Sequence, residues 1–163
     1  MARPSVRVPF TPLEIALDLA AASSFFLIAT AFFRLWPAVP EQVPVHFDVR
    51  GVADAFGPRS TLLALPVLWG VFYVLLTFLR FVPHWHNYPV AVTASNAPRL
   101  YRLSILLVAW VKVLVLWLMA TLFWQVCRAA VTASGQLGAP HPGWFVAGVG
   151  VVLAGYILAL RRK

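Results

Sequence analysis

The residues with the most chemical potential lie in one polar segment, residues 39–58, of an otherwise apolar chain. His46 and Asp48 are two positions apart, so in an extended segment both side chains point to the same side. Such a pair can form half of a metal site, a proton-transfer couple or a hydrogen bond that fixes the loop. Glu41 and Asp54 could complete a site for a hard ion or zinc, but the spacing matches no metal signature. We therefore predict no catalytic or metal site, and favour bracing of the loop first and partner recognition second.

Another charged pair falls inside the apolar runs. Lys112 lies near the middle of a predicted membrane span, where a charge is a functional hypothesis that requires a partner. Asp18 lies one to two turns into the first span from the same side, and the two depths differ by about 9 Å, within reach of a snorkelling lysine. We name Lys112 and Asp18 as an intramembrane polar pair. Another buried polar contact of Lys112, or a proton or ion path, remains an alternative.

The histidines and the cysteine indicate no cofactor. His84 and His86 form a His-x-His pair without an evident third ligand, which favours a loop feature at the membrane interface over a metal site. None of the four histidines lies in a predicted span, which argues against a haem held by histidines of facing helices. The single cysteine, Cys127, excludes an internal disulfide, and we interpret it as a small packing residue.

The composition indicates which elements position these residues. Of 163 residues, 61% are hydrophobic and 11% are charged, and the mean hydropathy is +0.83. Soluble domains average roughly 45–50% apolar and 25% charged residues. Four apolar runs are each long enough for the hydrocarbon core of about 30 Å. We predict an all-α membrane protein with a single domain over residues 1–163. Its spans are expected at about 12–35, 61–80, 101–126 and 143–160, with an ordered loop at 36–60.

The basic residues orient these spans, since positive charge resists export across a membrane. With both termini inside, the cytoplasmic side holds Arg3, Arg7, Arg80, Arg99, Arg102, Arg161, Arg162 and Lys163, and the outer side holds Arg34, Arg50, Arg59 and Arg128. This excess predicts cytoplasmic termini and an extracytoplasmic loop 36–60. Despite a net charge of +8, the scattered positions argue against a nucleic-acid partner and favour contact with membrane lipids.

The first span carries a helix-start signature and a stripe of small residues. Thr11, Pro12 and Glu14 match an N-cap, a first helical proline and a glutamate that reaches back to the cap. The two acids at the head of this run argue against a cleaved signal peptide. Small residues recur every four positions, which predicts packing against a neighbouring helix or another subunit. The predicted packing residues are Ala16, Ala20 and Ser24 in the first span and Gly150, Ala154, Gly155 and Ala159 in the fourth.

The polar segment also resembles a known family. The SdpI-like bacterial membrane proteins, with their N-terminal domain of unknown function, typically show Leu-Pro, two residues and then Ile/Val-Pro-x-His-Phe-Asn in this loop. Gly, Asp and Trp follow at fixed spacings. The matching positions here are Pro40, Val43, Pro44, His46, Phe47, Gly51 and Asp54. Asp48 stands where the family usually has Asn, and Phe56 where it usually has Trp. A weaker likeness covers residues 87–102.

The resemblance implies a membrane module whose outer loop recognises something, since the best understood family member resists a secreted peptide toxin and takes part in signalling. We therefore expect a non-enzymatic protein of the bacterial cytoplasmic membrane. Its outer loop would recognise a peptide, a protein partner or the membrane surface through His46, Phe47, Asp48, Gly51 and Asp54. The alternatives are an accessory subunit of a larger membrane complex and a small transporter or membrane enzyme that uses Lys112 and Asp18.

Overall fold

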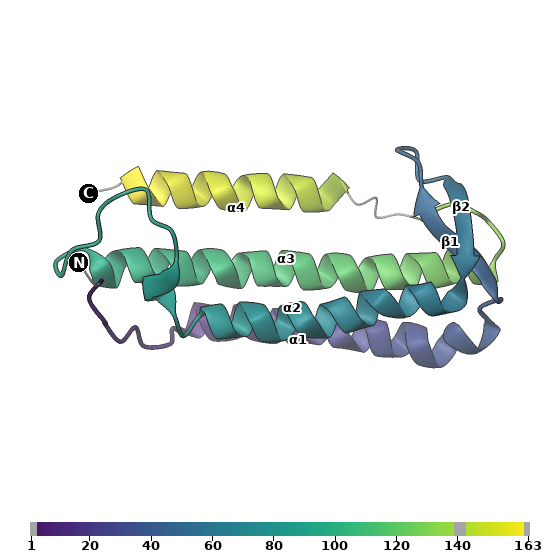
Figure 1. Cartoon of the computed structure of the whole chain (residues 1–163), viewed down its shortest axis with the longest axis horizontal. Coiled ribbons are helices and arrows are strands. Elements are labelled where there is room, and N and C mark those ends of the chain that lie inside the picture. The colour runs from purple at the N-terminus through teal and green to yellow at the C-terminus, as the bar shows by residue number, and fades with distance from the viewer. Residues whose placement is uncertain (1–2, 139–142, 162–163) are drawn as a thin grey trace.

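Four helices run along the long axis of the computed structural model, which describes residues 3–138 and 143–161 (Figure 1). They are α1 (Pro12–Arg34), α2 (Ala64–Leu79), α3 (Ala97–Val131) and α4 (Gly143–Arg161). Each lies in a helical segment that is long and apolar enough to cross a membrane. The predicted class is therefore confirmed: the chain is a mostly helical, multi-pass membrane protein.

The link between α1 and α2 holds a β-hairpin that the sequence analysis described only as an ordered loop. Strand β1 (Gln42–Phe47) pairs antiparallel with β2 (Ala53–Pro58), and 3₁₀ turns at Trp36–Ala38 and Arg59–Leu63 join the hairpin to the helices. An isolated two-stranded hairpin is marginally stable in water, so this one depends on packing against the helices. The hairpin lies at one end of the bundle and both termini lie at the other (Figure 1). We call these the hairpin end and the terminal end.

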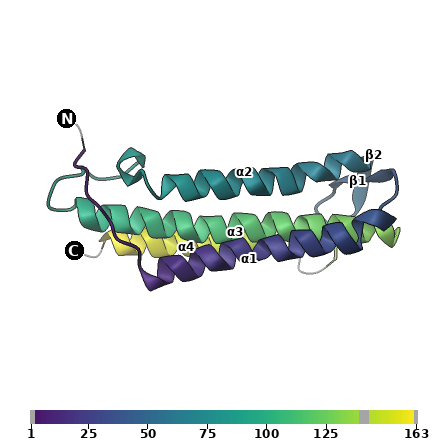
Figure 2. The same ribbon diagram turned by 90° about the horizontal axis from the view of Figure 1, so that it is seen from below.

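Helix α3 is the central element, because α1, α2 and α4 all pack against it (Figures 1 and 2). Its 35 residues make it about 52 Å long at 1.5 Å per residue, which exceeds a hydrocarbon core of roughly 30 Å. It begins four residues before and ends five residues after the predicted span 101–126. The last turns of α3 therefore extend alongside the hairpin.

An apolar core joins the hairpin to the end of α3. Val43 of β1 and Val39 before it are buried against α3 residues that include Phe123 and Cys127. Cys127 is fully buried, which agrees with its interpretation as a packing residue. This core holds the hairpin in a fixed position relative to the helices.

The faces that pack within the chain differ from the predicted stripes of small residues. In α1 the buried residues are Glu14, Leu17, Ala21, Ser24, Ile28 and Ala31, spaced by three or four positions, whereas Ala16 is exposed and Ala20 is half-buried. A strict four-residue stripe drifts by about 40° around the helix at each step, so it leaves the face that packs within the chain. For the exposed part of the stripe, packing against another subunit stays a prediction. Only Ser24 of the predicted α1 residues is fully buried.

In α4 the predicted residues Gly150, Ala154 and Gly155 are exposed, and an added Cβ at either glycine would meet no atom within 4 Å. Ala159 is half-buried at the terminal end. The close approach occurs instead at Gly148, where a Cβ would lie 2.9 Å from Leu114 of α3. For this face of α4, packing against another subunit stays a prediction.

Candidate functional site

A hydrogen-bonding contact between two side chains braces the hairpin across its two strands. His46 Nδ1 of β1 lies 2.5 Å from Asp54 Oδ1 of β2, and both side chains are largely exposed. The predicted same-side pairing of His46 with Asp48 does not form. The register is irregular on both sides of His46, which breaks the two-residue alternation, and Asp48 already belongs to the turn.

Asp48 organises that turn through its carboxylate. Its Oδ1 accepts hydrogen bonds from the backbone N–H groups of Arg50 (2.8 Å) and Val52 (2.9 Å), and Oδ2 lies 3.0 Å from Arg50 Nε. The hydrogen bond from Val52, together with Arg50, holds the pKa of Asp48 below its usual value of 3.8. An asparagine, typical of the resembled family, can accept the same two backbone bonds, so Asp48 retains the bracing role.

Two other residues of the resembled motif also have structural roles. Gly51 has φ +77°, a left-handed conformation that favours glycine, and its carbonyl accepts a hydrogen bond from Leu137 N (2.9 Å). Phe47 packs against the apolar core of the hairpin end. Glu41 pairs with Arg59 at 3.2 Å rather than with the histidine. The hairpin is thus a rigid platform rather than a loose loop.

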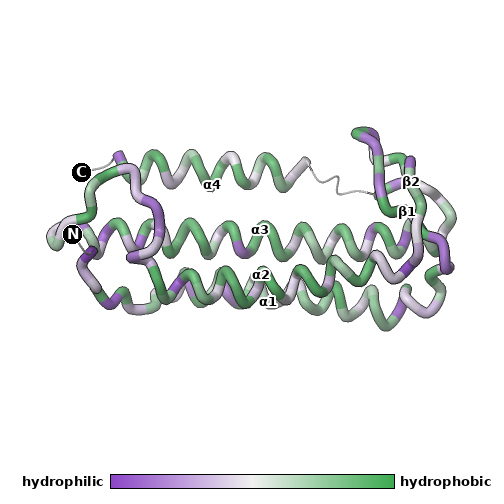
Figure 3. The backbone as a smooth tube through the Cα atoms, viewed as in Figure 1, coloured by the Kyte–Doolittle hydropathy of each residue, from purple (hydrophilic) through white to green (hydrophobic). Residues whose placement is uncertain are grey.

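This platform presents apolar side chains on its exposed surface. Val49 in the turn is 95% exposed and Phe56 of β2 is 62% exposed. Both residues lie outside the four candidate membrane spans, in a hairpin that mixes hydrophilic and hydrophobic residues, whereas hydrophobic residues predominate along the helices (Figure 3). Contiguous exposed apolar surface marks interaction sites in proteins, and these two side chains are the candidates for such a surface on the hairpin.

A second group of charged residues joins three helices at the terminal end. Glu14 of α1 is almost fully buried. Its Oε2 lies 3.1 Å from Arg80 Nη2 and its Oε1 lies 2.8 Å from Arg102 Nη1. Its Oε2 also accepts the N–H of Thr11, so the predicted capping box is confirmed. The sequence analysis missed Arg80 and Arg102. The sequence feature that indicates this pairing is that both arginines lie at the end of a predicted span on the same side of the membrane as Glu14.

Lys112 belongs to a separate charged group, farther along α3 from the terminal end. The structure brings it together with Asp18, and its Nζ also donates to Thr77 Oγ1 (2.7 Å) and lies 4.0 Å from the ring centre of Tyr73. The Lys112 side chain is 4% exposed and that of Asp18 is 52% exposed. The lysine is therefore fully enclosed by partners from α1 and α2, while the carboxylate faces the opening between these helices.

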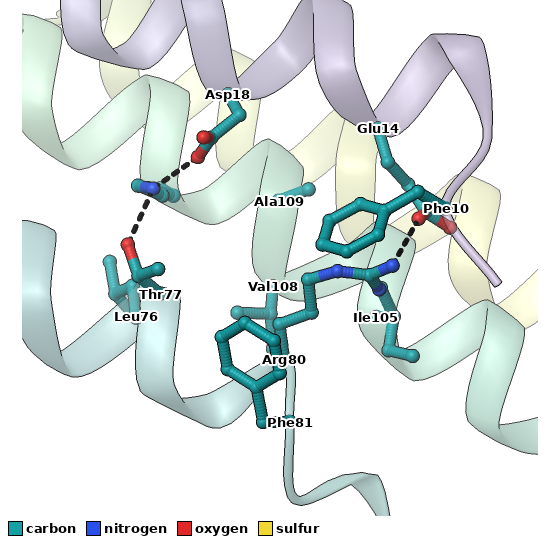
Figure 4. Close-up of a pocket in the computed structure, with 11 residues that line it drawn as sticks. Phe10, Glu14, Asp18, Leu76, Thr77, Arg80, Phe81, Ile105, Val108 and Ala109 are labelled. Atoms are coloured by element: carbon teal, nitrogen blue, oxygen red, sulfur yellow. Dashed lines mark hydrogen bonds and ion pairs between the residues drawn. The ribbon is translucent and has the colours of Figure 1, made fainter. Parts of the chain in front are cut away.

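A cavity of about 200 Å³ separates the two charged groups (Figure 4). Asp18, Thr77, Arg80 and Glu14 line it together with apolar side chains of α2 and α3. The Nε atom of Arg80 is buried and has no hydrogen-bond partner among the described residues. A buried donor of this kind is uncommon in folded proteins and suggests that a partner is absent.

His84 and His86 lie at the terminal end, opposite His46, and His141 lies outside the described residues. His84 belongs to the 3₁₀ turn Pro83–Trp85, and His86 Nε2 lies 3.0 Å from the carbonyl oxygen of Leu79. Burial lowers the pKa of His86. His46 and the His84–His86 pair therefore cannot contribute to one site.

The turn at Asp48 yields a prediction about local opening. Asp48→Ala should speed amide exchange at Arg50 and Val52 about tenfold, because each amide loses its acceptor, whereas Asp48→Asn should preserve slow exchange. The charge-dependent part of this stabilisation should be complete above pH 3.8 and lost as the pH falls through the lowered pKa of Asp48. Hydrogen exchange followed by NMR measures both effects. Glu41→Gln is the control, and fast exchange in the asparagine variant would contradict the role of the backbone bonds.

The buried pair yields a prediction about energetic coupling. Lys112→Met and Asp18→Asn should each lower the free energy of unfolding, because each leaves the other charge unpaired. The double variant removes both charges, so its loss should be smaller than the sum of the two single losses by about 0.5–3 kcal/mol. Reversible unfolding in detergent micelles measures the cycle. Lys112→Met combined with Asp54→Asn, at opposite ends of the bundle, should be additive. Additivity of Lys112→Met with Asp18→Asn would show that the contact carries no coupling.

Comparison with known proteins finds similarity to part of this chain. The family model described as a domain of unknown function, DUF1648, matches residues 24–70, which run from α1 through the hairpin into α2. An uncharacterized protein of Archaeoglobus fulgidus is 37% identical over 76 residues, and the match covers 39% of this chain and 42% of the relative. The chain thus spans less than half of that relative's length. No solved structure matches the chain significantly. The chain is therefore similar, from the second half of α1 through the hairpin into α2, to a domain whose function is not established.

Proposed function

We propose that this protein is a non-enzymatic membrane protein that binds a protein or peptide partner through its β-hairpin. The observation that carries the proposal is the exposure of Val49 and Phe56 on a hairpin whose every acidic side chain is already paired. A rigid platform loses little conformational entropy on binding, and exposed apolar side chains supply the contact area. The likeness to SdpI-like proteins, which we take as family relatives in this proposal, supports recognition at this loop.

The orientation is part of the same proposal. In the described residues, Arg3, Arg7, Arg80, Arg99, Arg102 and Arg161 lie at the terminal end and Arg34, Arg50, Arg59 and Arg128 at the hairpin end. Arg162 and Lys163 lie outside the described residues. This excess supports cytoplasmic termini and a hairpin on the outer face of a bacterial cytoplasmic membrane.

Two alternatives concern other parts of the chain. A role as an accessory subunit of a larger complex is favoured by α4, because none of its residues is buried within the chain. Lipid alone can also cover this helix, so we rank the subunit role second. A transporter or membrane enzyme based on Lys112 and Asp18 ranks third, since the lysine is enclosed by partners from two helices.

Photocrosslinking in native membranes tests the hairpin. A photoreactive amino acid at position 49 should give a discrete protein adduct, whereas the same group at position 33, which is 76% exposed on α1, should label lipid. Phe56→Asp should reduce the adduct from position 49 at least fivefold by placing a charge at the contact. Val90→Asp, at an exposed valine of the terminal end, is the matched control. Only lipid adducts from position 49 would contradict partner binding.

Labelling of single cysteines tests the orientation. In a Cys127→Ser background, a cysteine at position 46 should react with a membrane-impermeant maleimide in intact cells, because the hairpin faces outward. A cysteine at position 85, where Trp85 is 65% exposed at the terminal end, should react only after the membrane is opened. Reaction of both positions in intact cells would contradict the four-span topology, and the reverse pattern would invert the orientation.

A further inference from the structure

Two cavities adjoin at the terminal end and share Phe10, Arg80, Phe81 and Ile105 as walls. One is the cavity of about 200 Å³ between α1, α2 and α3 described above, which we now call the inner cavity. The other, of about 400 Å³, lies between residues 5–10 and the start of the link that follows α2, and we call it the entrance cavity. The two cavities meet at these shared walls but differ in lining, and we call them together the recess.

The entrance cavity is positively charged. Arg7, Arg80 and His84 line it, and no acidic residue does. The Arg7 side chain forms no ion pair or hydrogen bond with another residue in the described part of the chain. Arg80 is paired with Glu14 through one Nη atom only, and its Nε has no partner among those residues. The cavity therefore offers unused donors and positive charge to an anion.

Glu14 does not cancel this charge. Its carboxylate is shared between Arg80 and Arg102, and it also accepts the backbone N–H of Thr11. Two cations thus face one acid, before Arg7 is counted. An added anion at this position would complete the pairing rather than compete with Glu14.

The inner cavity has a different character. Apart from the charged residues at its two ends, its walls are apolar side chains such as Leu76, Ile105 and Val108, with Phe10 and Phe81 at the junction (Figure 4). Side chains of α1, α2 and α3 line the recess, and its opening lies between α1 and α2, which both pack against α3 (Figure 2). The half-exposed side chain of Asp18 marks that opening. A hydrocarbon chain fits such a recess, whereas a small inorganic ion gains nothing from its apolar walls.

The depth of the recess also matches a lipid. Arg80 directly follows Leu79, the last residue of α2, so the entrance cavity lies where a span ends and lipid phosphates begin. We propose that this recess binds an anionic phospholipid, with its phosphate beside Arg7 and Arg80 in the entrance cavity and part of an acyl chain in the inner cavity. This site lies at the opposite end of the bundle from the hairpin and is independent of the proposed partner binding.

Native mass spectrometry of the full-length protein tests the proposal. The protein is titrated with dioleoylphosphatidylglycerol, with dioleoylphosphatidylcholine and with inorganic phosphate. We expect at least tenfold tighter binding of the first lipid than of the second, and no displacement of bound lipid by millimolar phosphate. Equal binding of the two lipids would overturn the proposal, and displacement by phosphate would assign the site to a free anion instead.

Variants separate the two parts of the recess. Arg7→Gln should weaken binding of the anionic lipid about tenfold through loss of a charged hydrogen bond, and Arg161→Gln, an exposed arginine at the same end outside both cavities, should not. Val108→Trp should reduce binding by filling the inner cavity without changing any charge. Equal loss of lipid binding in the two arginine variants would indicate non-specific attraction of the anionic lipid to positive charge and would overturn the proposed site. Unchanged lipid binding in the tryptophan variant would show that the acyl chain does not occupy the inner cavity. Thermal unfolding of each variant shows that the fold is retained.

Discussion

Lys112 places a positive charge inside α3, the helix against which the other three pack. An unpaired charge in such a position costs several kcal/mol, so the neighbouring helices must bring polar partners to it. Asp18 comes from α1, and Thr77 and Tyr73 come from α2. Apolar side chains gain little by exchanging lipid for another helix, and directional contacts therefore fix which helices meet and at what depth. The arrangement of α1 and α2 around α3 follows from this requirement.

The apolar spans and the hairpin end are stabilised by different forces. Within the apolar spans the helices meet through polar bonds: Trp117 Nε1 of α3 donates to Ala20 O of α1, and Trp69 Nε1 of α2 donates to Ser24 Oγ of α1. At the hairpin end, α3 extends beyond the length that a bilayer requires, and an apolar core encloses Val43. Where a helix bundle extends past the hydrocarbon core into water, the hydrophobic effect stabilises such a core as it does in a soluble domain. The ordered hairpin depends on that length of α3.

The sequence predicted those features that depend on hydropathy, on the length of a span and on the position of a residue along it. Hydropathy and length predicted four helices, and depth along the chain singled out Lys112 and Asp18, which the structure brings together. The strands escaped prediction because Pro44 and Pro58 lie within them, and proline is uncommon in strands. The partner of His46 depends on local irregularity of the register, and the pairing of Glu14 with two arginines depends on three helices that are far apart in sequence.

Charge is balanced differently at the two ends, and this difference separates the two proposed binding sites. At the hairpin end each acid has its own basic partner, so the exposed feature that remains is apolar and suits contact with a polypeptide. At the terminal end Glu14 is shared by two arginines, so positive charge is in excess beside an apolar cavity, and this combination suits an anionic amphiphile. Because α3 extends from one end to the other, a single helix supports both surfaces without requiring that they communicate.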